Sequence, residues 1–171
     1  MMDFESLYAK YAPAVRRFAL FLCGDPMMAD DITSDTFLRA LVKHEQIRQP
    51  TVKSYLLTIA RNIYRDYGRK RARHPEAELH ESIPDGRASA QVWLEQATEI
   101  RAALAALREL PDADRESFLM RVLEDMPYEE IAATLGISVV TARVKVHRAR
   151  AKLMGVQGAA QEKSDAPGGK P

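Results

Sequence analysis

The feature that most constrains the fold is a helix, a glycine turn and a second, strongly basic helix near the end of the sequence. This segment, YEEIAATLGISVVTARVKVHRARAKL, runs from Tyr128 to Leu153. Gly136 can adopt the left-handed backbone that a tight turn requires, and Ser138 is a good N-cap for the helix that follows it. The pattern therefore predicts a helix-turn-helix, a motif that places its second helix in the DNA major groove.

The second of these helices has two different faces. One is an apolar stripe at helical spacing, made of Ala142, Val146, Ala149 and Leu153. The basic residues lie off that stripe with no acid among them, so we expect an open cationic surface. A basic face on a lone helix is often merely solvated. The glycine turn and the small residues at 139–141, which could approach base edges, favour DNA binding.

Composition and charge limit the remaining choices. The chain has 171 residues, of which 46% are hydrophobic, and this is enough for one compact domain or two small ones. The formal net charge is only +1, but acidic and basic residues are segregated into blocks. Residues 25–35 and 109–130 are rich in acids, and residues 61–73 and 143–152 are basic. A chain with this layout can bind DNA and also a basic protein partner.

The periodicity upstream is helical throughout. Apolar residues recur at helical spacing over 4–22, with Pro13 as an expected kink or break, and again over 28–43 and 52–67. Periodicity is then lost among prolines, glycines and acids. We therefore predict an all-α protein with two small helical domains and no strands. The expected boundaries are a first domain at 1–73, a linker at 74–90, a second domain with four helices at 91–154 and a disordered tail at 155–171.

Several classes of function lack the residues they need. Cys23 is the only cysteine, so no intramolecular disulfide can form, and its apolar surroundings predict a buried thiol. The four histidines lack ligand spacing, and we expect neither a metal nor a cofactor. No phosphate-binding loop or nucleophile elbow occurs, so neither an enzyme nor a small-molecule substrate is indicated. Without a signal peptide or an apolar span, we expect a cytoplasmic protein that does not insert into membranes.

Three segments resemble, in order and spacing, those of bacterial extracytoplasmic-function sigma factors. They are ADDITSDTFLRAL at 29–41, SYLLTIARNIYRDYGRKR at 54–71, and the stretch from Leu110 to Leu153. Members of this family have two helical domains, called regions 2 and 4, and direct core RNA polymerase to particular promoters. The resemblance implies a sigma factor in transcription initiation whose partners are core RNA polymerase, promoter DNA and an anti-sigma factor.

The resemblance also implies roles for individual residues. An acidic edge would bind the polymerase through Asp30, Asp31, Asp35 and Arg39. The minus-ten element would be bound by Arg61, Asn62, Arg65, Arg69, Lys70 and Arg71. The minus-thirty-five duplex would be bound by Thr141, Arg143, Lys145, Arg148 and Arg150. Three departures from the family pattern are Tyr55 in place of tryptophan, Pro127 in place of a serine cap, and the run ARVK at 142–145.

Some alternatives stay open at this stage. Tyr55, Tyr64 and Tyr67 could stack on bases, although their positions on the apolar stripe favour the core. A helix-turn-helix regulator acting without polymerase would use residues 1–73 as an effector or dimer domain. A metal-dependent nucleic-acid enzyme would need clustered acids, and the group at 25–35 has poor spacing for a metal.

Overall fold

The computed structural model of the protein describes residues 3–43, 51–73 and 90–164, and it describes side chains at 3–43, 51–70 and 98–155. Within these ranges every regular element is an α-helix and no strand occurs, as the sequence predicted. The helices are α1 (Phe4–Cys23), α2 (Pro26–Lys43), α3 (Val52–Arg73), α4 (Ala90–Arg108), α5 (Asp112–Val122), α6 (Tyr128–Leu135) and α7 (Val139–Ser164).

Local capping explains where the first helices begin and end. The Asp3 carboxylate accepts a hydrogen bond from the Ser6 amide at 2.7 Å, which satisfies a free donor at the start of α1. Gly24, with φ of 69°, ends the helix in the left-handed region. Helix α1 continues through Pro13, so the break that the sequence allowed at this position does not occur.

The helix-turn-helix has the predicted geometry. Gly136 ends α6 with φ of 66°, and the Ser138 hydroxyl accepts a hydrogen bond from the Thr141 amide at 3.0 Å, which caps α7. Pro127 precedes α6 without a side-chain capping bond. One expectation was wrong: α7 is helical as far as Ser164, well beyond the tail boundary expected at 155, because alanine, glutamine and glutamate support helix after residue 158.

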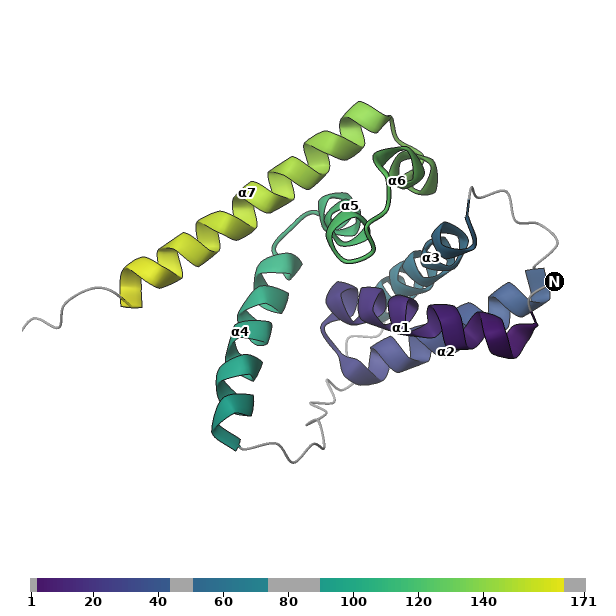
Figure 1. Ribbon diagram of the computed structural model, residues 1–171, viewed down its shortest axis with the longest axis horizontal. Coiled ribbons are helices and arrows are strands. Elements are labelled where there is room, and N and C mark those ends of the chain that lie inside the picture. The colour runs from purple at the N-terminus through teal and green to yellow at the C-terminus, as the bar shows by residue number, and fades with distance from the viewer. Residues whose placement is uncertain (1–2, 44–50, 74–89, 165–171) are drawn as a thin grey trace, which may run out of the picture.

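The helices form two groups that dock onto one another (Figure 1). Helices α1, α2 and α3 pack together as a bundle, and α5 and α6 pack against α7. The two groups meet where α5 contacts α1 and α6 contacts α3, and α4 contacts both α1 and α7. The chain between the groups, at 74–89, lies outside the described residues.

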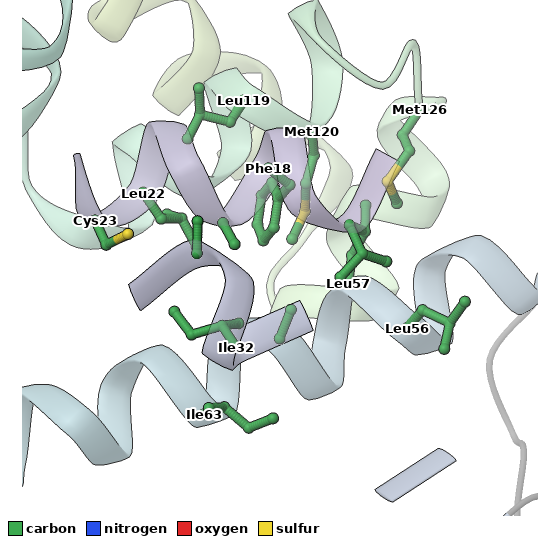
Figure 2. Close-up of a cluster of buried hydrophobic side chains, with 14 of the residues drawn as sticks. Phe18, Leu22, Cys23, Ile32, Leu56, Leu57, Ile63, Leu119, Met120 and Met126 are labelled. Atoms are coloured by element: carbon green, nitrogen blue, oxygen red, sulfur yellow. The ribbon is translucent and has the colours of Figure 1, made fainter. Parts of the chain in front are cut away.

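Buried side chains from both groups belong to one cluster (Figure 2). Phe18 of α1 is completely buried, as are Ile32 of α2, Leu57 of α3 and Met120 of α5. Helical periodicity shows which face of each helix is apolar, but it does not show that the two groups share one cluster. In the docked arrangement, burial of apolar surface also stabilises the contact between the two groups.

Two individual residues also test the sequence analysis. Cys23 is 2% exposed, which confirms the predicted buried thiol, and burial raises the pKa of this thiol above its ordinary value. Leu41 belongs to the apolar pattern over 28–43, yet it is 52% exposed on α2. It shares its side of α2 with two other exposed apolar residues, Leu38 and Val42.

Candidate nucleic-acid interface

Helix α3 carries the first predicted set of DNA-binding residues, and only part of that set is open to solvent. Asn62, Arg69 and Lys70 are exposed, whereas the Arg61 side chain is only 15% exposed and that of Arg65 is 37% exposed. The Arg71 side chain lies outside the part of the structure in which side chains are described. Asn62 and Lys70 are therefore open to solvent, and Arg69 is 71% exposed although it pairs with Asp66 of the same helix at 2.8 Å.

Arg61 and Arg65 are held by one carboxylate from the other group of helices. Glu116 of α5 is fully buried, and its carboxylate accepts a bond from Arg61 Nε at 2.6 Å. Arg65 donates to the same carboxylate from Nε and from Nη2, each at 3.1 Å. In this arrangement the two arginines, which were expected to bind the minus-ten element, are paired within the chain. Their partner lies more than fifty positions away in sequence, where helical periodicity gives no information about contacts.

Helix α7 carries the second predicted set of DNA-binding residues, and some members of this set also form ion pairs. Arg143 and Arg150 are exposed and form no ion pair among the described residues. Lys145 Nζ lies 3.3 Å from Asp114 Oδ1, and Arg148 Nη1 lies 3.8 Å from Asp114 Oδ2. No acid stands among the basic residues at 143–152, and the structure supplies one from α5. Arg148 nevertheless keeps 62% of its side chain exposed.

Thr141, at the start of α7, has a capping role. Its hydroxyl accepts a hydrogen bond from the Ser138 hydroxyl at 2.7 Å, and its amide donates to that same hydroxyl. The side chain is half-buried. The structure therefore gives Thr141 a local function in starting α7, in addition to its predicted proximity to DNA.

Helix α5 places carboxylates toward both predicted DNA-binding helices. Successive residues of an α-helix are about 100° apart, so positions 114 and 116 lie on nearly opposite faces. Asp114 accordingly faces α7 and Glu116 faces α3, and both are almost completely buried. A third acid just after α5, Glu124, accepts bonds from Arg17 at 3.0 and 3.2 Å and pairs with Lys53 at 3.0 Å. Sequence reasoning missed these three acids as partners, although it had noted the acid-rich stretch at 109–130.

Arg143 is oriented by an aromatic ring that the sequence analysis did not identify. Its guanidinium carbon lies 5.4 Å from the centroid of the Tyr128 ring at the start of α6. The guanidinium of Arg121 lies over the same ring at 4.8 Å. Cation–π contacts of this kind favour a defined side-chain position. Arg143 is thus exposed but held near the N-terminal end of α7.

The predicted acidic edge of α2 is mostly engaged within the first group of helices. Asp30 pairs with Arg16 at 2.7 Å, and Asp35 accepts a hydrogen bond from the Tyr67 hydroxyl at 2.6 Å. Arg39 lies 3.8 Å from Asp66, and Asp31 is exposed. In the described ranges no three potential ligands gather as a metal site would require. Asp30 and Asp35 thus act as partners of neighbouring side chains, and Asp25 accepts hydrogen bonds from backbone amides at the start of α2.

The three tyrosines of α3 are bound to the surrounding helices. The Tyr55 hydroxyl donates to the Lys43 carbonyl at 3.3 Å, and the Tyr64 hydroxyl accepts from Arg115 at 3.2 Å. Tyr67 donates to Asp35, as described above. All three rings are half-buried and pack against the hydrophobic core. These contacts favour the core interpretation of the tyrosines over stacking on bases.

Replacing Tyr67 with phenylalanine tests its bond to Asp35. Burial and the hydrogen bond to Asp35 raise the pKa of Tyr67 to about 12. The unfolded chain, with a tyrosine pKa of about 10, therefore ionises first. The stability that this bond contributes is fully present below pH 10 and is lost as the pH rises toward 12. We expect Tyr67→Phe to lower the free energy of unfolding by about 1 kcal/mol at pH 7. The variant should also lack the loss of stability that the Tyr67–Asp35 bond causes in the wild type as the pH rises from 10 toward 12. Both effects are measured by urea unfolding.

The control for this measurement is Tyr8→Phe, because the Tyr8 ring is 44% exposed and its hydroxyl forms no hydrogen bond within the described structure. This variant should lose stability between pH 10 and pH 12 as the wild-type protein does. Equal alkaline profiles for wild type and Tyr67→Phe would contradict the assignment.

The described helices include none with the length and apolar character needed to cross a bilayer.

Comparisons with known proteins match the chain to two families, one over α1–α3 and one that includes α5 and α6. Residues 7–74 match the family described as sigma-70 region 2, and residues 100–153 match sigma-70 region 4. The chain is 34% identical over 148 residues to the ECF RNA polymerase sigma factor EcfG of Rhodopseudomonas palustris, covering 82% of this chain and 77% of that protein. It is 32% identical over 152 residues to the ferric citrate uptake sigma factor FecI of Escherichia coli, covering 86% and 87%.

Two solved structures are similar over nearly the whole chain. One is the sigma factor RpoE of Bartonella quintana in complex with the anti-sigma factor NepR, with a TM-score of 0.71, 26% identity, and coverage of 92% of this chain and 98% of that one. The other is CnrH in complex with the cytosolic domain of CnrY, with a TM-score of 0.69, 25% identity, and coverage of 91% and 88%.

Proposed function

Because the chain belongs to the extracytoplasmic-function RNA polymerase sigma factors, we propose that α3 and α7 bind one promoter at two places while α2 holds the polymerase. Sigma factors are non-enzymatic initiation factors that bind core RNA polymerase and promoter DNA. A helix-turn-helix regulator acting without polymerase is not favoured, because the region 2 match occupies the segment that such a regulator would use as an effector domain.

The proposal depends on the exposed cations of two separate helices. Helix α3 lies in the part that matches sigma-70 region 2, and α7 begins in the part that matches region 4. On α3 they are Arg69 and Lys70, and on α7 they are Arg143 and Arg150. Clustered arginines and lysines bind the phosphate backbone with little dependence on sequence. Cations in two regions allow the protein to hold an upstream duplex and a downstream single strand at once.

Helix α7 is proposed to enter the major groove of the minus-thirty-five duplex. Arg143 lies near the N-terminal end of this helix, where a recognition helix reaches base edges, and an arginine can donate two hydrogen bonds to guanine. Its contact with Tyr128 reduces the freedom that the side chain would otherwise lose on binding. Arg148 and Arg150 are proposed to contact phosphates, and Lys145 to join them once its bond to Asp114 is released.

Helix α3 is proposed to bind the strand exposed at the minus-ten element. Asn62 is exposed and has an amide that can both donate to and accept from a base edge. Arg69, Lys70 and Arg71 are proposed to hold the phosphates around it. Arg61 and Arg65 would contribute only after leaving Glu116.

The exposed side of α2 is proposed to dock on the polymerase. Asp31 and Arg39 are exposed near the apolar residues Leu38, Leu41 and Val42, which are 59%, 52% and 80% exposed. A surface that combines uncovered apolar side chains with charges suits a protein partner. Asp30 and Asp35 are proposed to add negative charge at this edge while keeping their contacts with Arg16 and Tyr67.

We also propose an anti-sigma partner and a cytoplasmic location for this chain. Both solved neighbours were captured with a second protein, NepR in one case and the cytosolic domain of CnrY in the other. This supports an anti-sigma factor as a partner of the present chain. A cytoplasmic location is proposed because promoter DNA and the polymerase are found there.

A pull-down with core RNA polymerase followed by run-off transcription from a promoter pool tests the proposed function. We expect the folded chain to bind core polymerase and to direct transcription from a subset of promoters. Asn62→Ala should keep core binding and duplex binding but reduce open-complex formation, because the asparagine is proposed to act only on the separated strand. Folded protein that fails to bind core polymerase would contradict the proposal.

Arg148→Ala tests the phosphate contact on α7. Removing one phosphate contact should weaken binding of the upstream duplex several-fold and reduce the slope of log affinity against log salt by about 0.9. The measurement is a salt titration of duplex binding by fluorescence anisotropy. Arg101→Ala removes the same charge from an exposed position on α4 and should leave the slope unchanged. Equal slopes for Arg148→Ala and wild type would exclude the contact.

A further inference from the structure

Helix α7 exposes two valines that neither the core nor the helix requires. Val140 is 71% exposed and Val144 is 46% exposed. The other two valines of this stretch belong to the core, since Val139 packs against it and Val146 is completely buried. A β-branched side chain is a weaker helix former than alanine, because the helix restricts its rotation. The exposed pair therefore does not stabilise α7 and is open to a contact outside the chain.

The two valines lie at the centre of the outer face of α7. Successive residues of an α-helix are about 100° apart, so Val140 and Val144 lie within about 40° of each other and nearly opposite the buried apolar stripe. By the same spacing, Arg143 and Arg150 border the valines on one side of the helix and Arg148 borders them on the other. All three arginines are exposed. The outer face of α7 thus has an apolar centre between two cationic margins.

The ring of Tyr128 holds the Arg143 side chain toward α6 and away from the two valines. The guanidinium carbon of Arg143 lies 5.4 Å from the centroid of this ring. Arg121 of α5 approaches the same ring at 4.8 Å, and its Nη1 donates to the Met126 carbonyl at 3.1 Å. Because the arginine is held in this way, α7 presents a positioned guanidinium and an uncovered apolar pair side by side.

The chemistry of this face fits a base pair that contains thymine. The C5 methyl of thymine is an apolar group in the major groove, and arginine pairs with the N7 and O6 acceptors of guanine. Phosphates border the groove on both sides, where the two cationic margins of α7 would meet them. A stable protein interface buries about 800 Å² on each partner, which is far more than two valine side chains offer. Duplex DNA is therefore the better occupant of this face.

We propose that Val140 and Val144 are specificity-determining residues that pack against thymine methyl groups next to the guanine bound by Arg143. This inference rests on the proposed entry of α7 into the major groove. The two valines are about 6 Å apart along the helix axis, which is close to two base-pair steps of about 3.4 Å each. The preferred duplex should therefore carry a guanine and two thymines, on either strand, within about four neighbouring base pairs.

The test removes single methyl groups from the DNA. The full-length chain first selects duplexes from a randomised pool, and each thymine of a selected duplex is then replaced in turn by deoxyuridine, which lacks only the methyl group. Affinity is measured by fluorescence anisotropy. We expect two of these replacements to weaken binding by the wild-type chain about fourfold each, the effect of losing one buried methyl-sized group. Replacement of the other thymines should leave affinity nearly unchanged.

Variants of the two valines assign each methyl contact to a side chain. In Val140→Ala one of the two deoxyuridine effects should disappear, and in Val144→Ala the other, because the methyl group has lost its partner. Alanine is a good helix former, so both variants should keep α7 intact. The matched control is Val122→Ala, since Val122 is 48% exposed on α5 and lies outside the proposed DNA-binding set. This control removes the same two methyl groups and should keep both deoxyuridine effects.

The outcomes separate this inference from the proposed function. If the chain binds a selected duplex but no deoxyuridine replacement weakens binding, or if both valine variants keep both effects, the proposed role of α7 stands and thymine reading is overturned. Valine variants that bind the duplex normally but lose binding to core RNA polymerase would assign the pair to a protein interface and also overturn it. If the chain selects no duplex, the proposed role of α7 is itself wrong and this inference fails with it.

Discussion

Phe18→Ala is expected to lower the free energy of unfolding by about 3–5 kcal/mol, the range for truncating a fully buried aromatic side chain. Phe18 is 0% exposed and lies in the cluster that also includes Leu57 of α3 and Met120 of α5 (Figure 2). Its removal leaves a cavity that rigid neighbouring helices fill only in part. The measurement is urea unfolding followed by circular dichroism.

The position of Phe18 gives this prediction a second part. Because the cluster includes residues of both groups of helices, the variant should also weaken their docking and increase the radius of gyration measured by small-angle X-ray scattering. Phe4→Ala is the control, since Phe4 is 41% exposed at the start of the same helix, and it should cost less than about 1 kcal/mol. A cost for Phe18→Ala as small as that of the control would contradict the packing.

Removing both cations around Glu124 is expected to have the next largest effect. Glu124 is fully buried at its side chain and is bonded to Arg17 and Lys53. Replacing Arg17 and Lys53 with methionine keeps apolar stems at these positions but leaves the buried Glu124 carboxylate unpaired. The free energy of unfolding of the docked form should fall by about 3–5 kcal/mol. The expected result is a lower urea midpoint together with a larger radius of gyration.

A rescue variant shows whether the unpaired charge is the cause. Adding Glu124→Gln to the double variant removes the charge while keeping most of the shape, and it should restore most of the lost stability. This design uses residues outside the proposed DNA-binding set, so it tests docking without changing the DNA contacts. Failure of Glu124→Gln to restore stability would indicate that the unpaired charge is not the cause and that the lost hydrogen bond from Lys53 Nζ to the Glu124 carbonyl, 3.0 Å long, matters more.

The helices themselves could be predicted because their signals are local. Asp3, Gly24, Gly136 and Ser138 act within a few residues of where they stand, through caps and left-handed turns. The apolar stripe of α7 was also predicted correctly, since Ala142, Val146 and Ala149 are all completely buried. The predicted tail boundary failed because a weak helical tendency without a stop signal allowed α7 to continue to Ser164.

The candidate site was predicted less completely, and the residues that failed have a common cause. Arg61, Arg65 and Lys145 were expected to bind DNA, and the structure pairs all three with acids from another helix. Their partners, Glu116 and Asp114, come from α5 and are defined only when the helices pack. Arg143 and Lys70 are exposed, and no acid among the described side chains pairs with them.

The sequence by itself determined an all-helical chain, the helix-turn-helix and the two stretches rich in cations, because caps, turns and periodicity depend on residues close together in the chain. Only the tertiary structure decided which of those cations are free. The pairing of Glu116 with Arg61 and Arg65 depends on how two groups of helices dock, and docking is governed by the shapes and charges of whole surfaces. A charge far along the chain can therefore neutralise a binding residue without leaving any local signal in the sequence.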